Sequence, residues 1–225
     1  MESVMENTKF AKNLTSGAHT VKPKPAYDFV KRVLDIVCSL IALILLSPVF
    51  LILAILVKAT SEGPVFFAHR RVGKGGKEIK IYKFRSMVTN AEELIKQFTP
   101  EQKAEYEKNF KLENDPRITK IGSFMRKTSL DELPQLINIL KGDLSIVGPR
   151  PVMDVETRIY GNYRDMLLGV KPGLTGFWAA NGRSATSYKR RRAMEIYYVK
   201  NRSLLFDAKI IFKTFISVFK GEGAV

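Results

Sequence analysis

Two adjacent carboxylates, Asp131 and Glu132, lie in the chain's densest group of chemically capable residues, RKTSLDELPQ at 126–135. Ser129 and Glu132 have the spacing of a capping box, in which each side chain bonds the backbone near the other. Alternatively, Pro134 suits the first residue of a helix. Both patterns place Asp131 at or beside a helix N-terminus, where the helix dipole favours a carboxylate and nearby anions.

An ionised aspartate in this setting can attack phosphorus or help to hold Mg²⁺. Arg126 and Lys127 add positive charge close to Asp131. The simpler interpretation is helix capping alone, because an adjacent Asp-Glu pair is common. The spacing by itself leaves both catalysis and capping open.

Two further groups of residues could bind phosphate. Arg150 stands between Pro149 and Pro151, so it projects from a rigid loop, and its planar guanidinium suits bidentate phosphate contact. Lys83 and Arg85 place two cations at the end of a predicted strand. Either group, taken alone, could also be an ordinary surface feature.

An uncharged apolar stretch, 36–57, is the element that must position this chemistry. It is 22 residues long, and about 20 apolar residues are needed to cross a bilayer as a helix. Ser47-Pro48 interrupts it, because proline kinks or breaks a helix and the serine hydroxyl can bond the carbonyls that the bend frees. Basic residues flank both ends, and each flank favours the cytoplasmic side. The pattern therefore favours a re-entrant membrane helix over a kinked span or a buried core helix.

The net charge of +15 implies an anionic partner. With a membrane segment present, an anionic lipid membrane is the expected one, since each basic residue near such a surface contributes about 1 kcal/mol. No nucleic-acid-binding motif is recognisable, so no nucleic acid is expected. Cys38 is the only cysteine, which excludes an intrachain disulfide, and His19 and His69 belong to no metal-binding cluster.

The patterns predict an α+β chain in three parts: a flexible polar tail at 1–26, a re-entrant membrane helix at 27–62 broken at Ser47-Pro48, and a mostly helical cytosolic catalytic domain at 63–225. A small β-hairpin is expected from 65–67 and 78–84, joined by a plain turn rather than a phosphate cradle. Helices are predicted at 90–110 with a break at 99–100, at 119–126, 131–140 and 152–168, with a short strand at 144–147.

Two C-terminal helices, 187–201 and 204–220, combine basic and apolar residues. The first contains the run KRRR at 189–192. In the second, Lys209, Lys213 and Lys220 fall four and seven apart and share one face. A basic face opposite a Phe-rich face is typical of an interfacial amphipathic helix, with packing against the domain core as the alternative.

Taken together, these segments resemble the bacterial sugar transferases, monotopic phosphoglycosyl transferases that begin polysaccharide assembly on a lipid carrier. The resemblance covers about residues 31–221. It is carried by Lys31-Arg32 and Asp35 before the apolar helix with Ser47-Pro48, GPVFFAHRRVG at 63–73, KFRSM at 83–87, DPRITKIG at 115–122, RKTSLDELPQLINILKGDLSIVGPRP at 126–151, and VKPGLTGFW at 170–178.

This resemblance implies transfer of a sugar-1-phosphate from a UDP-sugar, UDP-glucose or UDP-galactose, to undecaprenyl phosphate, with release of UMP and a requirement for Mg²⁺. Asp131 would be the nucleophile that forms a covalent phosphosugar intermediate, and it would lie near the metal; Glu132 would act as base or orienting group. Arg126 and Arg150 would bind phosphate. We expect substrate contacts from Lys83, Arg85 and Pro149 as well.

The resemblance also implies a place on the bacterial inner membrane, with the catalytic domain on its cytoplasmic face, and a role in starting exopolysaccharide, capsule or O-antigen assembly. The chain resembles the short form of the family, without the additional N-terminal membrane helices of the long form. At 179–183 it has AANGR where glucose- and galactose-phosphate transferases often have QVSGR, so the sugar stays open, as does a homo-oligomer. The competing hypothesis is a non-catalytic basic scaffold on the membrane surface.

Overall fold

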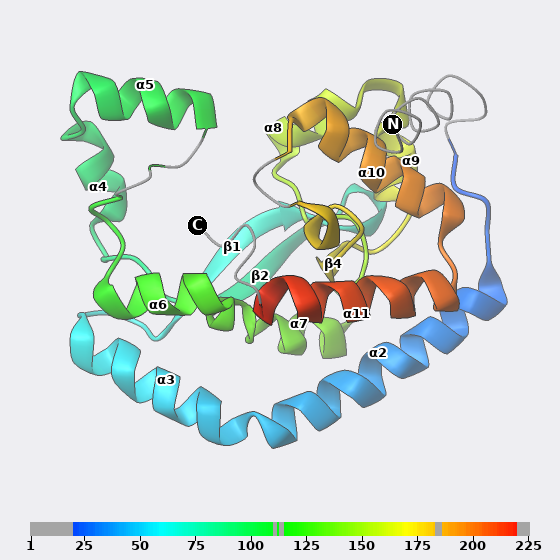
Figure 1. Ribbon diagram of the computed structural model, residues 1–225, viewed down its shortest axis with the longest axis horizontal. Coiled ribbons are helices and arrows are strands. Elements are labelled where there is room, and N and C mark those ends of the chain that lie inside the picture. Colours follow the sequence, from blue (N-terminus) through cyan, green and yellow to red (C-terminus); the bar gives the residue numbers. More distant parts are fainter. Residues whose placement is uncertain (1–19, 110–111, 113–114, 183–185, 220–225) are drawn as a thin grey trace.

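The computed structural model describes residues 20–109, 112, 115–182 and 186–219. Helices dominate, and the strands form two small two-stranded sheets, β1–β2 and β3–β4 (Figure 1). The α+β prediction is therefore confirmed at the level of a mixed helical and sheet structure. Most of the predicted tail lies outside the described residues.

Helices α2 (Pro25–Leu45) and α3 (Ser47–Thr60) form the bent pair predicted from Ser47-Pro48. Their axes differ by 63°, and the Ser47 hydroxyl donates to the Ile44 carbonyl at 2.8 Å, as expected for a kink that frees backbone acceptors. Helix α2 begins at Pro25, two residues before the predicted boundary, because proline fits the first turn of a helix.

The bent pair keeps most of its apolar side chains exposed. Phe29, Ile44 and Leu51 are 71%, 64% and 63% exposed, so the buried-core alternative is wrong. Among the described residues no single helix is long and apolar enough to cross a bilayer, whereas α2 and α3 together meet that test by length and composition.

Three charged side chains of α2 fasten it to the rest of the domain. Arg32 donates to the carbonyls of Ile139 and Leu140 at 2.6 and 2.8 Å, which satisfies the free C-terminal carbonyls of α7 (Gln135–Lys141). Asp35 accepts the Ile146 N–H at 2.9 Å, and Lys31 forms a 2.7 Å ion pair with Asp207 near the C-terminal end of the chain. These polar contacts, made by neighbouring residues of α2, therefore fix the position of α2 against the rest of the domain.

Strands β1 (Phe66–Val72) and β2 (Glu78–Phe84) form the predicted antiparallel hairpin, and a short turn of residues 74–76 joins them. Ile79 and Ile81 alternate with exposed residues and pack against α7. Asn138 of α7 binds the edge of β2 with both side-chain ends: it accepts the Tyr82 N–H at 2.9 Å and donates to the Lys80 carbonyl at 2.6 Å. These two hydrogen bonds fix the position of α7 along strand β2.

The second sheet pairs β3 (Ser145–Val147) in parallel with β4 (Gly173–Thr175). A Cβ atom on Gly173 would lie 2.1 Å from the Gly148 nitrogen, so the two backbones can approach this closely only without a side chain there. The close approach holds the loop after β3, which carries Pro149 and Arg150, against the core.

Two predicted helices differ in the structure. Residues 152–168 form α8 (Asp154–Thr157), a 3₁₀ segment η3 (Arg158–Tyr163) and α9 (Arg164–Leu168), because Gly161 takes a φ of +51° that no regular helix contains. The predicted helix at 131–140 begins only with α7; residues 130–132 are a 3₁₀ turn, η2. The charged stretch after residue 90 forms α4 (Ala91–Lys96) and α5 (Pro100–Asn109), with the predicted break.

The C-terminal helices are α10 (Tyr188–Asn201) and α11 (Leu204–Phe219). The KRRR run of α10 does not form one exposed basic face, because Arg191 is buried. On α11, Leu205, Phe212 and Phe215 are 62–69% exposed, so the interfacial interpretation of this helix remains a prediction. Lys220, the third lysine expected on its face, lies outside the described residues.

Candidate active site

Asp131 and Glu132 lie around the ammonium group of Lys83 at the end of strand β2. Lys83 Nζ is 2.6 Å from Glu132 Oε1 and 3.7 Å from Asp131 Oδ2. The two carboxylates belong to η2, and Ser129 starts this turn in the left-handed conformation with φ +58°. That reversal at the end of α6 (Lys120–Thr128) turns the chain back toward β2 and brings the carboxylates to the lysine.

The predicted capping box is wrong, because the Ser129 side chain does not cap the η2 turn. Pro134 immediately precedes α7, close to the alternative prediction, and Asp131 stands four residues ahead of that helix. Its position therefore owes more to the Lys83 contact than to a helix terminus.

Burial makes Asp131 a weaker acid than an exposed aspartate. The side chain is only 7% exposed, and burial raises its pKa above the ordinary 3.8, while the Lys83 charge lowers it, Glu132 raises it and Arg126 lowers it. The two cations favour the ionised form of Asp131, and a buried carboxylate has little water around it, which favours attack on an electrophile.

Arg126 is placed beside Asp131, as the sequence predicted. It lies in the last turn of α6 and its Nε donates to Ser86 Oγ at 2.9 Å. Burial lowers its pKa, and the Asp131 charge acts in the opposite direction. A Cβ on Gly122 would lie 2.0 Å from the Ser86 carbonyl oxygen, so this glycine is what lets α6 pack directly on the segment after β2.

The pair Asp115–Arg117 completes this side of the site, and sequence reasoning gave it no role. Arg117 donates to both oxygens of Asp115, at 2.8 and 2.6 Å, and its guanidinium lies over the rings of Phe98 and Tyr106 at 5.2 and 5.0 Å. Although burial raises it, the bonds from Arg117 hold the pKa of Asp115 below its usual value. The short spacing in DPR at 115–117 is the only local signal for this pair.

Arg85, predicted to contact substrate, binds the end of α3 instead. It is 6% exposed, and its Nη2 donates to the Ser61 carbonyl at 2.7 Å and to Ser61 Oγ at 2.8 Å. Lys83 and Arg85 separate because strand β2 ends at Phe84 and the chain then turns toward the bent helix pair. The structure thus gives Arg85 a structural role and does not bring it to Asp131.

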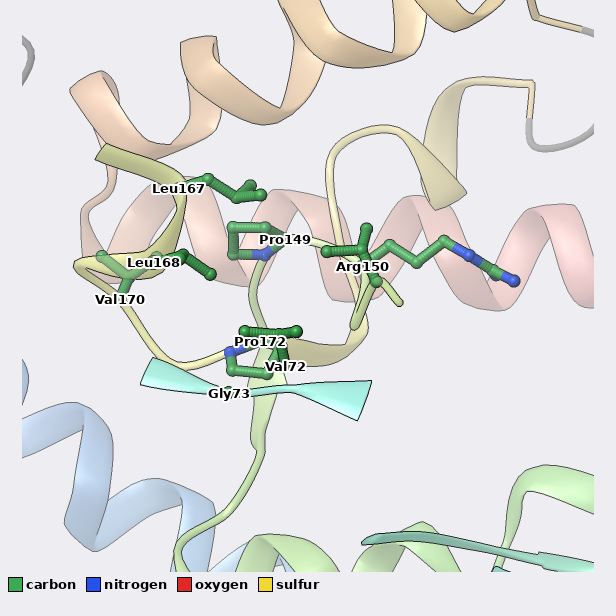
Figure 2. Close-up of a pocket in the computed structure, with 9 residues that line it drawn as sticks. Val72, Gly73, Pro149, Arg150, Leu167, Leu168, Val170 and Pro172 are labelled. Carbon is green, nitrogen blue, oxygen red and sulfur yellow. The ribbon is translucent and has the colours of Figure 1, made fainter. Parts of the chain in front are cut away.

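Arg150 belongs to a second cationic group. Its guanidinium is 5.4 Å from the centre of the Trp178 ring, and its backbone N–H donates to Glu195 Oε1 at 3.1 Å. The Pro149 carbonyl accepts the Gly173 N–H at 2.8 Å, which ties the loop to β4. Figure 2 shows that the Arg150 side chain extends away from the other residues of a small apolar pocket, which are Val72, Gly73, Pro149, Val152, Leu167, Leu168, Val170 and Pro172.

Asp131 and Glu132 are the carboxylates at this site that would hold Mg²⁺. Among the described residues no group of three or more His, Cys, Asp and Glu side chains could hold a metal. Mg²⁺, however, is often held by one or two carboxylates together with substrate phosphates. Asp131 and Glu132 already accommodate one cationic group, the Lys83 ammonium, between them.

This fold and site define a class of protein: a domain that joins a bent apolar helix pair to a buried aspartate, Asp131, and a half-buried glutamate, Glu132, both beside the Lys83 ammonium. The family model described as "Bacterial sugar transferase" matches residues 26–221. The chain belongs to the bacterial sugar transferase family.

Similar proteins carry informative names. The chain is 49% identical over 205 residues to the undecaprenyl-phosphate galactose phosphotransferase of Salmonella typhimurium, covering 89% of this chain and 43% of that protein. It is 44% identical over 204 residues to the exopolysaccharide production protein ExoY of Sinorhizobium fredii, covering 89% and 90%. It is 42% identical over 217 residues to the UDP-glucose:undecaprenyl-phosphate glucose-1-phosphate transferase of Escherichia coli, covering 88% and 43%. The chain therefore spans less than half of two of these relatives and nearly all of the third.

Proposed function

We propose that this protein transfers a sugar-1-phosphate from a UDP-sugar, UDP-glucose or UDP-galactose, to undecaprenyl phosphate and releases UMP, as the first step of exopolysaccharide, capsule or O-antigen assembly. The observation that carries the proposal is the buried Asp131 carboxylate beside Glu132 and Lys83 in a member of this family. The names of the relatives support the acceptor and the class of donor.

The proposed reaction has two displacements at one phosphorus. An Asp131 oxygen attacks the phosphorus that bears the sugar, and the bond from that phosphorus to the bridging oxygen breaks, so UMP leaves with the bond electrons. An oxygen of undecaprenyl phosphate then attacks the same phosphorus and releases the Asp131 carboxylate. The product is a sugar linked to undecaprenol through a diphosphate. Glu132 orients Lys83 or accepts a proton.

Fixed positive charge makes these anionic encounters feasible. Both substrates carry phosphate, and each must approach a carboxylate, so the repulsion has to be offset. We assign this role to Lys83, whose ammonium is 3.7 Å from Asp131 Oδ2, and to Arg126, whose charge also favours the ionised Asp131 carboxylate. Asp131 and Glu132 would hold Mg²⁺, which would neutralise charge on the leaving phosphate.

A re-entrant bent pair would bring this site to the lipid acceptor on the cytoplasmic face of the bacterial inner membrane. Both outer ends of the pair join the rest of the domain, while its vertex lies at the lower edge of the molecule (Figure 1). The exposed apolar side chains of α2 and α3, and those of α11, supply a surface that lipid could cover.

UMP release tests the reaction. Detergent-solubilised protein is incubated with undecaprenyl phosphate, Mg²⁺ and each of several UDP-sugars, and UMP is measured. We expect UMP with one donor and its loss when the metal is chelated. Absence of UMP with every UDP-, GDP- and CDP-sugar, together with salt-sensitive binding to anionic vesicles, would favour the non-catalytic scaffold instead.

Impermeant thiol labelling tests the membrane arrangement. Cys38 is first replaced by serine, and single cysteines are then introduced as Ala26→Cys, just inside α2, and Lys74→Cys, in the exposed hairpin turn. A re-entrant pair predicts that both sites are labelled from the cytoplasmic side only. Labelling of the two sites from opposite sides would contradict it and support a kinked span.

A further inference from the structure

A second group of cations lies beyond the Asp131 site, and three separate segments supply it. Arg71 comes from the end of β1, Arg150 from the loop after β3 and Arg191 from the first turns of α10. Arg150 and Arg191 both lie over the Trp178 ring, at 5.4 and 4.9 Å. Burial, together with the charges of Arg150 and Arg191 and against that of Glu156, lowers the pKa of Arg71 to about 10. We call these three arginines the arginine cluster.

The carboxylates that face the arginine cluster do not balance its charge. Glu156 approaches Arg191 only at 3.4 Å and also caps its own helix, since its Oε2 accepts the Met153 N–H. Glu195 is fully buried, and burial raises its pKa to about 7, so it is only partly ionised at neutral pH. Like charges gathered in a partly buried place are destabilising unless an anion joins them.

Some of the cluster's donors are unsatisfied. Arg71 Nη1 and Arg191 Nε and Nη2 are buried and have no hydrogen-bond partner among the described residues. Arg191 is 7% exposed, so it lies deeper than the other two, and its charge adds to the positive potential that an anion would meet at the arginine cluster. Arg150 is exposed and Arg71 is half-buried, so a bound anion can reach both. Guanidinium groups are well suited to phosphate.

The strand register aligns the arginine cluster with the Asp131 site. Phe67 pairs with Lys83, and His69 and Arg71 follow on the same face of the hairpin. Phe67 and Arg71 are four positions apart, about 13 Å at ~3.3 Å per residue, and the long Lys83 and Arg71 side chains can partly close this distance. Between them, burial and the charges of Arg71, Lys83 and Arg150 lower the pKa of His69 to about 4, which leaves it neutral.

The arginine cluster stands at the end of the hairpin that is remote from α3. At the near end, the Phe84 ring contacts the Phe50 ring of α3 at 5.5 Å. At the far end, Val72 pairs with Val152. The bent pair itself runs along the hairpin, since Ala42, Leu43 and Leu46 pack on the cluster of Ile79 and Ile81. We assign the arginine cluster to the soluble donor because its guanidinium groups suit a phosphate and it lies at the end away from α3.

We infer that Arg71 and Arg150, supported from behind by Arg191, bind the phosphate of the leaving nucleoside monophosphate while the sugar-bearing phosphate lies at Asp131. The inference rests on the proposed function, which supplies a nucleoside diphosphate sugar as donor. It assigns a substrate contact to Arg71 and a positioning role to Arg191. The arginine cluster thus determines donor affinity and product inhibition by UMP.

The only tryptophan of the chain, Trp178, reports on this site directly. Purified protein is titrated with UMP, with uridine, and with vesicles containing anionic lipid, while Trp178 fluorescence and the binding of radiolabelled UMP are followed. We expect saturable UMP binding, and no comparable response to uridine or to the vesicles. Saturation by the vesicles, with competition against UMP, would overturn the inference in favour of a lipid phosphate.

Arg71→Gln is the test variant and Arg70→Gln the matched control. Arg70 is the adjacent arginine, its side chain is 74% exposed, and it faces Glu78 on the other side of the hairpin. We expect Arg71→Gln to weaken UMP binding and to raise the donor KM by about 10-fold or more, with the acceptor KM unchanged. For Arg71→Lys we expect a UMP affinity and a donor KM between those of the wild type and of Arg71→Gln. Thermal unfolding checks that each variant is folded.

Two results separate this inference from the proposed function. UMP release that persists with an unchanged donor KM in Arg71→Gln would overturn the arginine cluster as the nucleotide site and leave the reaction standing. UMP binding that depends on Arg71, in a protein that releases no UMP from any donor, would support the site and contradict the reaction.

Discussion

Replacing Asp131 by asparagine is expected to lower the rate of UMP release by roughly 10³-fold or more, because the amide cannot act as the nucleophile. Folding should survive. The side chain is buried, burial already disfavours its charge, and asparagine has nearly the same shape. Lys83 keeps its 2.6 Å contact with Glu132. Membrane binding should be unchanged, since α2, α3 and α11 do not include the site.

The covalent intermediate makes this prediction sharper than a loss of activity. After incubation with donor alone, intact-protein mass spectrometry should show an added hexose phosphate on the wild type and none on Asp131→Asn. Labelled UMP should exchange into the donor without any lipid acceptor, again only in the wild type. Glu132→Gln should still form the adduct, more slowly. An adduct on Asp131→Asn would assign the nucleophile to another residue.

Asp143→Asn is a suitable control for the charge change. Asp143 follows α7, and its Oδ2 is 3.9 Å from Lys141 Nζ and 3.5 Å from Asn138 Nδ2. Its replacement removes one carboxylate near the same helix without touching the proposed nucleophile. We expect Asp143→Asn to keep activity close to that of the wild type. An equal loss of activity in Asp131→Asn and Asp143→Asn would indicate that both substitutions disturb the fold around α7, and would not identify Asp131 as the nucleophile.

Local patterns predicted the elements well where the chain's own periodicity decides the structure. The hairpin follows from the alternation of Ile79 and Ile81 with polar residues, and the bend in the apolar segment follows from Pro48. The prediction of one continuous helix at 152–168 was wrong because one glycine, Gly161, takes a positive φ that apolar periodicity does not reveal.

The site was harder to predict because its contacts are distant in sequence. The Lys83–Glu132 bond joins residues 49 apart, and no spacing rule connects them. Arg85 shares a motif with Lys83, yet it binds α3, since the end of the strand sends the two side chains to different neighbours. Arg71 and Arg191 were missed entirely: each is an ordinary member of a basic run until the fold places Arg191 over Trp178 and brings its charge to act on Arg71.

The pH dependence of activity should depend on Lys83. Burial raises the pKa of Asp131, and the Lys83 charge acts against this by favouring the ionised form. Activity needs the carboxylate ionised, so kcat/KM should fall as the pH drops through the raised pKa. Lys83→Met removes the opposing charge, so the pKa of Asp131 rises further. The acid limb of the kcat/KM profile is therefore expected to move to higher pH.

Three comparisons separate this effect from a general loss of activity. Lys83→Arg keeps the charge and should leave the acid limb close to its wild-type position, even if the rate falls. Lys80→Met removes an exposed lysine from the opposite face of the same strand and should change neither the limb nor the rate. Lys83→Met should also lower kcat/KM by about 10²-fold, because a fixed cation near the developing charge is lost. An acid limb that stays in place, or moves to lower pH, would show that Lys83 does not control the ionisation of the nucleophile.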